Sequence, residues 1–195
     1  MFYIFPNVLS PDTCDEIIKD GKQYILEKAE VYNHRDKKSS RDDPNIRKSS
    51  VCFIEGKENK INQLAWDFIR KANKDYFKYD LDYFQAVQFS EYSKGGFFDW
   101  HQDDVGMSHL DEVRKLSLGV NLSAPNTYEG GELEFYNGGK PFEDMGDVKG
   151  EQVAKDIQSQ GSVVVFDSRD WHRVKLVTKG LRYSMVCWTV GKNFR

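Results

Sequence analysis

The sequence predicts a mainly β protein with a two-sheet jelly-roll core and flanking helices. Its first indication is a succession of short strand-like stretches after residue 80, separated by turn residues. The second is a pair of segments ahead of them, at 10–29 and 58–77, whose apolar residues recur at helical spacing. The third is the stretch 181–190, which is apolar on both faces of a strand. A strand of that kind is buried on both faces, so we expect its sheet to be covered outside as well as inside.

Length and composition restrict the kinds of protein that this chain can be. With 195 residues, 39% hydrophobic, we expect a single domain over 1–195, with helical support and a lid-like loop in 1–79 and the jelly-roll core at about 80–190. The net charge of −3 gives no basic excess, so nucleic acid is not an expected partner. Three scattered cysteines show no disulfide or zinc-ribbon spacing, which favours a reducing cytoplasm.

The first third of the chain supplies the expected helices. Residues 1–5 are apolar but end at Pro6, which is too short for a signal peptide or a membrane span and predicts an edge strand. Ser10 and Pro11 are a typical helix start, and the helical spacing that follows continues to Ala29. We assign structural roles to this helix and to the one at 58–77.

A polar loop separates the two helices. Residues 33–45 contain no apolar side chain, and alternation resumes in a strand at 47–54. Two interpretations of the loop at 33–50 stay open: a solvated connection, or a lid over a substrate, because long irregular loops in compact domains are often functional. His34 in this loop and His109 in a later one are expected at the surface.

The strand-like stretches of the second half follow in order. The one after His172 is expected to form a hairpin, with Lys179 and Gly180 at its turn. The glycines at 130–131 suggest a close approach of the backbone to another group. The expected strands are 83–89, 114–121, 128–135, 161–166, 174–178 and 181–190, with a short strand possible near Val153.

A histidine and an aspartate at His101 and Asp103 form the first chemically informative motif. On a strand, residues i and i+2 point to the same face, so these side chains can take adjacent positions on one metal ion. His172 follows a strongly apolar strand and is a candidate third ligand. Two histidines and a carboxylate are the usual ligands of non-haem Fe(II). His-x-Asp also occurs by chance, and Asp99 shares the parity of Asp103, so spacing alone does not choose the acid.

An arginine on the last strand is the second informative feature. Arg182, Ser184 and Trp188 share one face of the stretch 181–190. A buried guanidinium is costly unless it meets an anion, which can be a bound dicarboxylate or an acidic side chain of the protein. Trp188 either lines the pocket that would hold such a bound dicarboxylate or is an ordinary core aromatic.

The motifs taken together resemble a known family. Residues 92–103 have the pattern Tyr-x-x-Gly-x-x-Phe-x-x-His-x-Asp, and His172 is followed ten residues later by Arg182. This order resembles the 2-oxoglutarate- and Fe(II)-dependent oxygenases, with the best match in the prolyl 4-hydroxylase-like subfamily. The resemblance covers about residues 80–190 and implies a double-stranded β-helix, or jelly-roll, core with helices packed on one side.

The resemblance also implies roles for individual residues. His101, Asp103 and His172 would hold the iron and form the catalytic centre. Arg182 would bind the distal carboxylate of 2-oxoglutarate, and Ser184 completes an Arg-x-Ser pair that related oxygenases use at the same carboxylate.

The resemblance also points to two further positions near the co-substrate. Tyr92 matches a tyrosine that hydrogen-bonds the co-substrate in peptidyl prolyl hydroxylases. Asn121 falls where some relatives carry another co-substrate-binding tyrosine, so this chain departs from their pattern at that position. Collagen-type enzymes use lysine where this chain has Arg182.

The implied activity is a dioxygenase that uses Fe(II), 2-oxoglutarate and O2, with ascorbate as a candidate reductant, and releases succinate and CO2. The expected substrate is a peptidyl proline, so a protein or peptide is the expected partner. The alternatives are the same chemistry on another side chain, a free amino acid or a nucleobase, and a jelly-roll binding module that holds a metal without catalysis. A zinc hydrolase would explain the metal ligands but not the pair of Arg182 and Ser184. Fold and ligand set are common to many substrates, and neither specifies the oligomeric state.

Overall fold

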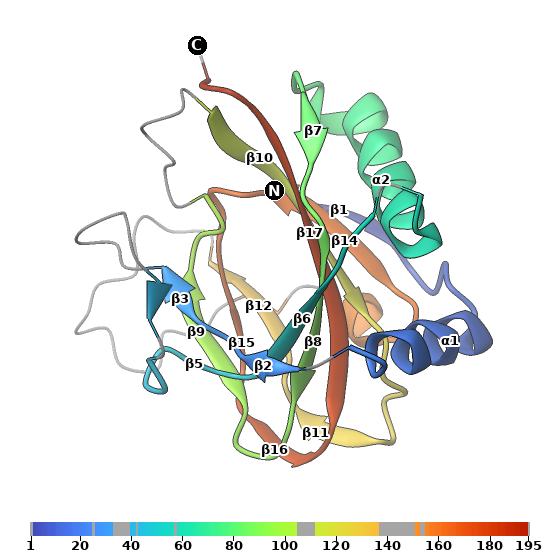
Figure 1. Cartoon of the computed structure of the whole chain (residues 1–195), viewed down its shortest axis with the longest axis vertical. Helices are drawn as coiled ribbons and strands as arrows, with labels where there is room; N and C mark the ends of the chain where they lie inside the picture. The colour runs from blue at the N-terminus through green and yellow to red at the C-terminus, as the bar shows by residue number, and fades with distance from the viewer. Residues whose placement is uncertain are drawn as a thin grey trace.

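Two antiparallel sheets form the body of the protein, as seen in a computed structural model (Figure 1). The structure describes residues 2–24, 26–32, 40–41, 43–56, 58–104, 112–136, 151–152 and 155–194. Residues 33–39 and 42 of the predicted lid-like loop lie outside these ranges, as do His109 and Val153; His34 is one of these loop residues.

The larger sheet contains eight strands among the described residues. Its order is β1-β14-β10-β17-β8-β6-β2, and β7 pairs with the far end of β17. The strands are β1 (Phe2–Phe5), β14 (Val163–Asp167), β10 (Glu112–Asn121), β17 (Arg182–Lys192), β8 (Val87–Tyr92), β6 (Ser50–Ile54), β2 (Glu27–Lys28) and β7 (Tyr83–Phe84). The expected edge strand at the start of the chain is confirmed, because β1 pairs only with β14 in this order.

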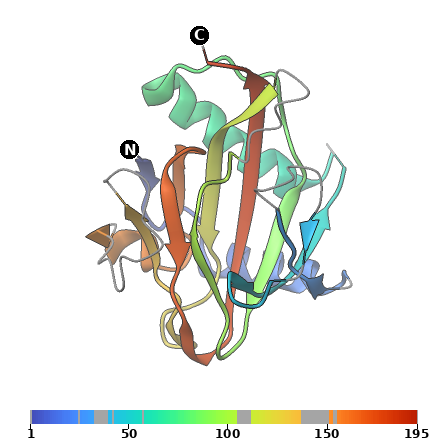
Figure 2. The same ribbon diagram turned by 90° about the vertical axis from the view of Figure 1, so that its left-hand side faces the viewer.

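The smaller sheet faces the larger one and has the order β13-β12-β15-β9-β5. Its strands are β13 (Glu151–Gln152), β12 (Leu133–Tyr136), β15 (Trp171–Val174), β9 (Phe97–His101) and β5 (Arg47–Lys48). Two short pairs complete the strands: β11 (Tyr128–Gly130) with β16 (Val177–Gly180), and β3 (Val31–Tyr32) with β4 (Ser40–Arg41). Figure 1 shows the smaller sheet on one side of the larger sheet and the helices on the other, and in Figure 2 the side of the smaller sheet faces the viewer. The predicted mainly β jelly roll is confirmed.

The helices cover the outer face of the larger sheet (Figure 1). The first, α1 (Pro11–Gly21), begins as predicted, since the Ser10 hydroxyl accepts a hydrogen bond from the Thr13 amide at 3.1 Å. The expected continuation to Ala29 is wrong. Gly21 closes the helix against the ring of Phe89, where a β-carbon would come within 2.6 Å of ring atoms, and the chain then enters β2.

The second helix confirms the segment predicted at 58–77. Its α-helical part is α2 (Lys60–Ala72), capped by the Asn59 side chain, and a π-helical turn η1 (Asn73–Phe77) extends it. Lys78 ends it in the left-handed conformation, with φ of 61°. This helix packs on β8, β10 and β14, so the largest apolar cluster lies between the helices and the larger sheet.

Burial of β17 on both faces is confirmed by its position. Tyr183, Met185 and Cys187 belong to the core beneath the helices, while Arg182 and Trp188 line a cavity between the two sheets. Within the described residues, no helix combines the length and apolar character needed to cross a membrane.

The expected hairpin after His172 is wrong. Strand β16 pairs with β11, whereas β17 pairs with β10 and β8, so the turn at Gly180 carries the chain from the β11–β16 pair into the larger sheet. The stretches 47–54 and 128–135 are likewise each divided into two strands in different sheets. Alternation of apolar residues predicts which side chains are buried, but it does not specify the partner strand.

Candidate metal and co-substrate site

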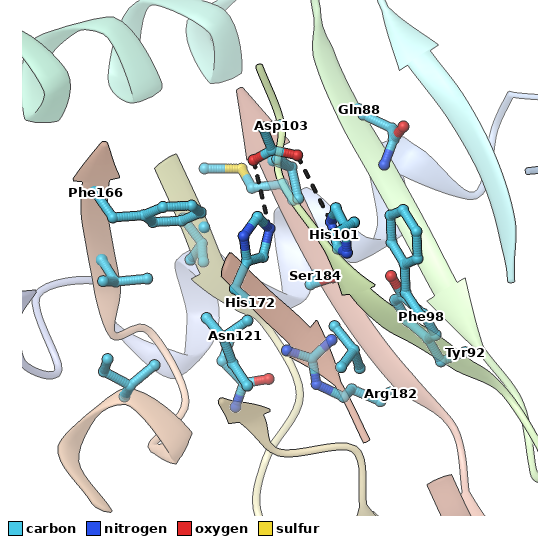
Figure 3. A pocket seen from close by; sticks show the side chains of 18 of the residues that line it. Gln88, Tyr92, Phe98, His101, Asp103, Asn121, Phe166, His172, Arg182 and Ser184 are labelled. Carbon is cyan, nitrogen blue, oxygen red and sulfur yellow. Dashed lines mark ion pairs between the residues drawn. The ribbon is translucent and has the colours of Figure 1, made fainter. Parts of the chain in front are cut away.

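The predicted ligand residues meet at one end of the smaller sheet. His101 ends β9 and is paired in register with His172 on β15, and Asp103 lies just beyond the end of β9. One ligand atom from each of the three residues lies within 4.8 Å of the others. The Asp103 carboxylate faces both rings, with its oxygens 3.7 Å from His101 Nε2 and 3.5 Å from His172 Nε2 (Figure 3).

Both imidazole rings are oriented by the same kind of hydrogen bond to a backbone carbonyl. Nδ1 of His101 lies 2.7 Å from the carbonyl oxygen of Asp99, and Nδ1 of His172 lies 2.9 Å from that of Asp170. A carbonyl oxygen can only accept, so each Nδ1 carries the proton and donates it. The Nε2 lone pairs are therefore left free to bind a cation, which is the arrangement found at metal-ligating histidines.

The structure decides between the two candidate acids. The Asp99 side chain is exposed, and its carboxylate accepts from the Trp100 amide at 2.8 Å, whereas Asp103 is buried beside both histidines. Asp99 contributes to the site only through its backbone carbonyl.

The electrostatics of the site suit a divalent cation. Burial is the largest cause that lowers the pKa of His101 well below its ordinary value, and His172 nearby adds to this. Burial alone would raise the pKa of Asp103, but His172, His101 and Arg114 together outweigh it and the pKa is lowered. A neutral His101 imidazole beside an ionised Asp103 carboxylate is the combination of protonation states that metal binding requires.

One buried oxygen of this cluster has no hydrogen-bond donor. Among the described residues, Asp103 Oδ2 has less than 1 Å² of exposed surface and finds no hydrogen-bond partner. A buried acceptor without a partner is costly, and a bound cation would satisfy it. The residues present therefore fit Fe(II), for which two histidines and one carboxylate are the usual ligands.

Arg182 lies in the same cavity as the ligand cluster (Figure 3). It is paired in register with Tyr92 at the start of β17 and is only 5% exposed, with its guanidinium 5.6 Å from the centre of the Tyr92 ring. Its Nε has no hydrogen-bond partner, and no carboxylate of the described residues lies within ion-pair distance of it. The described part of the chain thus gives no support to the alternative of an internal salt bridge.

The other predicted residues also line the cavity, with different surroundings. Ser184 and Tyr92 are both buried near Arg182. Asn121 has its amide group engaged, since Nδ2 donates to the carbonyls of Ser123 and Gln158 at 3.2 and 2.8 Å. Its Oδ1 is within 3.4 Å of the Tyr128 hydroxyl.

Trp188 forms part of the cavity wall, as one of its two interpretations predicted. The guanidinium of Arg114 lies 4.1 Å from the centre of its ring, and its Nε1 has no hydrogen-bond partner among the described residues.

Three further residues of the site were assigned no role from the sequence, although one of them, Phe98, belongs to the motif at 92–103. The ring of Phe98 stacks on His101, with centroids 3.5 Å apart, and Phe166 meets His172 edge-on at 4.7 Å. Arg47, on the edge strand β5, also lines the cavity. Strand β5 pairs with β9, which lies far from it in the chain, so no local spacing reveals Arg47.

The cavity has the composition of a small-molecule site, because apolar walls surround a few polar groups. Its empty space, which includes solvent at the open mouth, is about 670 Å³. Arg182 lies at one end of it and the ligand cluster at the other (Figure 3).

Comparison with known families gives a match that covers this site. Residues 87–190 match the family model described as the 2OG-Fe(II) oxygenase superfamily. A PKHD-type hydroxylase from Synechococcus sp. (strain JA-2-3B'a(2-13)) is 30% identical over 105 residues, which are 53% of this chain and 42% of that protein. Another from Psychrobacter sp. (strain PRwf-1) is 36% identical over 104 residues, 51% and 36% of the two chains. This chain therefore spans less than half the length of these relatives.

Solved structures of similar fold cover nearly the whole chain. A prolyl-4-hydroxylase of Pseudomonas putida superposes with a TM-score of 0.69 at 19% identity, covering 98% of this chain and 93% of its own. The viral collagen prolyl hydroxylase of Paramecium Bursaria Chlorella virus-1 gives 0.67 at 19% identity, covering 97% and 96%. At such identities the similarity establishes the double-stranded β-helix fold.

Proposed function

We propose that this chain, which belongs to the 2OG-Fe(II) oxygenase superfamily, hydroxylates a C–H bond of a peptidyl proline and releases succinate and CO2. The observation that carries the proposal is the position of two histidines and a carboxylate, within 4.8 Å of one another, in the same cavity as a buried arginine without a carboxylate partner among the described residues. A metal site next to a guanidinium suits a co-substrate that has one end on the metal and a carboxylate at the other.

In this proposal the metal ligands are His101, Asp103 and His172. The carbonyls of Asp99 and Asp170 hold the two rings with Nε2 toward Asp103, so the three donor atoms are in place before the ion arrives. When bound, Fe(II) together with 2-oxoglutarate and O2 supplies the oxidative chemistry. The protein contributes fixed geometry and a cavity with apolar walls, which limits access of water to the reacting groups.

The co-substrate would be held by the residues at the start of β17. The Arg182 guanidinium can form two parallel hydrogen bonds with the distal carboxylate, and Ser184 and Tyr92 can add hydroxyl donors. Asn121 contributes less to this contact, because its amide group already donates to two backbone carbonyls. We assign Asn121 and Trp188 to the walls of the cavity.

The choice of peptidyl proline is supported by the relatives. Two similar structures are prolyl hydroxylases by name, and a third is a prolyl hydroxylase from Trichoplax adhaerens in complex with a hypoxia inducible factor peptide, with a TM-score of 0.68 at 17% identity. The relatives similar in sequence are PKHD-type hydroxylases. A protein or peptide is therefore the proposed partner.

The experiment is a reaction of the iron-loaded protein with proline-containing peptides, 2-oxoglutarate and ascorbate under air. We expect succinate to form, faster in the presence of a suitable peptide, and mass spectrometry to find one added oxygen atom on proline. If the added oxygen atom is found on another residue, the proposed oxygenase chemistry stands but the proposed substrate is wrong. No succinate from the iron-loaded protein with any peptide would instead support a non-catalytic binding module.

A further inference from the structure

A second arginine lines the cavity, and neither the metal nor the co-substrate accounts for it. Arg47 is only 7% exposed, although it lies on the edge strand β5. It is paired in register with Phe98, and its guanidinium lies 4.5 Å from the centre of the Phe98 ring. That ring stacks on His101 with centroids 3.5 Å apart. A single aromatic ring thus separates the charge of Arg47 from a proposed iron ligand.

Arg47 has different partners from two less buried arginines of the chain. Arg173 pairs with Glu134 at 2.8 Å, and Arg169 pairs with Asp167 at 2.6 Å. Arg47 instead donates from Nε to the Ser49 hydroxyl at 2.9 Å, and no carboxylate of the described residues forms an ion pair with it. The Arg47 side chain lines the cavity, and its guanidinium has further N–H donors besides Nε.

The charges around the cavity do not balance without a further anion. Its charged lining residues are Asp103, Arg47 and Arg182. Fe(II) would add two positive charges and 2-oxoglutarate two negative ones, so one positive charge remains in excess after both have bound. A buried charge without a partner is strongly unfavourable, and a buried guanidinium meets carboxylate better than any neutral group.

We infer that Arg47 binds a carboxylate of the primary substrate, so that the enzyme selects acidic molecules. The inference rests on the proposed function, because it takes the metal and Arg182 sites as occupied by Fe(II) and 2-oxoglutarate. The carboxylate can belong to a free amino acid or to an acidic side chain next to the hydroxylated residue of a peptide. Both offer the same bidentate contact to the guanidinium.

The test compares substrates that differ only in this charge. One arm uses free L-amino acids, proline included, against their primary amides, and the other uses proline peptides with Glu or Gln beside the proline. Binding to the protein loaded with Fe(II) and 2-oxoglutarate is measured by anaerobic calorimetry, and stimulated succinate formation is measured under air. We expect acid to bind at least about tenfold more tightly than amide in one arm, as for a charge-assisted hydrogen-bond pair. The arm of the experiment in which acid binds more tightly than amide identifies the source of the carboxylate.

Variants assign the preference to Arg47. Arg47→Gln should remove the preference for acid over amide, and Arg47→Lys should retain part of it because the charge remains. The matched control is Lys48→Gln, which removes the same charge from the exposed neighbour on β5 and should retain the preference.

Three results would overturn the inference: equal binding of acid and amide by the wild type, no binding in either arm, or a preference that survives Arg47→Gln. Failure of the proposed function looks different, because the iron-loaded wild type would then form no succinate from 2-oxoglutarate even without a substrate.

Discussion

His101 and His172 lie opposite each other on neighbouring antiparallel strands, with ring centroids 4.1 Å apart. Each Nδ1 is held by the carbonyl two residues earlier in the chain, so both Nε2 atoms face Asp103. The geometry of the metal site is thus set mainly by backbone atoms of two paired segments. Substitutions of the donor side chains should then affect metal binding far more than the fold.

The first prediction separates the two aspartates near His101. Asp103→Ala removes a donor group and the negative charge that offsets the ion, so we expect loss of most iron binding. Asp99→Ala removes an exposed carboxylate but leaves the carbonyl that orients His101, so iron binding should be retained. Iron content after anaerobic loading, measured on protein with an unchanged circular dichroism spectrum, tests this. The reverse ranking of the two variants would show that the wrong acid has been assigned.

The second prediction concerns Arg182. Removal of one partner of a buried charged pair costs about 2–5 kcal/mol, so Arg182→Ala should strongly raise the KM for 2-oxoglutarate. Arg182→Lys should be milder because it keeps the charge and loses the planar fork. The control Lys179→Ala removes a charge from an exposed pair with Glu129 and should leave this KM unchanged. Wild-type KM in both Arg182 variants would make Arg182 a structural residue.

The third prediction concerns a glycine beside Arg182. Gly131 has φ of +69°, and a β-carbon there would lie 2.8 Å from Arg182 Cδ and 2.9 Å from Val177 Cγ2. Gly131→Ala should therefore displace Arg182 and raise the KM for 2-oxoglutarate. Gly56→Ala is the matched control, because Gly56 has φ of +96° with no other atom within 4 Å of the added carbon. Both variants should lose about 1–2 kcal/mol of stability from the left-handed backbone, but only Gly131→Ala should change the KM. An equal KM in the two variants would contradict the contact.

The fourth prediction concerns the pH dependence of the metal-free protein. Burial and the neighbouring His172 lower the pKa of folded His101 well below its ordinary value of 6.5. As the pH falls below about 6.5, the unfolded chain therefore takes up a proton at this residue and the folded chain does not, so the free energy of unfolding decreases. Urea unfolding at several pH values, compared with His101→Gln, measures this. The variant should show a smaller decrease, and an identical decrease in both proteins would assign it to other groups.

Local signals in the sequence were sufficient for several elements of the fold. The start of α1 follows from Ser10 and Pro11, because capping depends on residues only a few positions apart. The end of α1 could not be predicted in this way, because it depends on the packing of Gly21 against Phe89 on a distant strand. The partner of β16 was mispredicted for a related reason, since alternation fixes which faces are buried and leaves open which strand lies alongside.

The same distinction applies to the site. His101, Asp103, His172 and Arg182 were predicted because few residue types can bind a metal ion or a buried anion, and their order resembles a known family. Arg47 was not predicted to be a site residue. A lone arginine at the start of a strand gives no indication of function until β5 pairs with β9 and places the guanidinium over Phe98.

The most direct test of the central claim is anaerobic titration of the metal-free protein with Fe(II) and then 2-oxoglutarate, followed by visible absorption. Chelation of Fe(II) by a 2-oxo acid gives a weak charge-transfer band, which we expect in the wild type. The band should be absent in Asp103→Ala, and in Arg182→Ala it should require much more 2-oxoglutarate. Wild-type protein that binds Fe(II) but develops no band at saturating 2-oxoglutarate would contradict the assignment of this cavity as an oxygenase site.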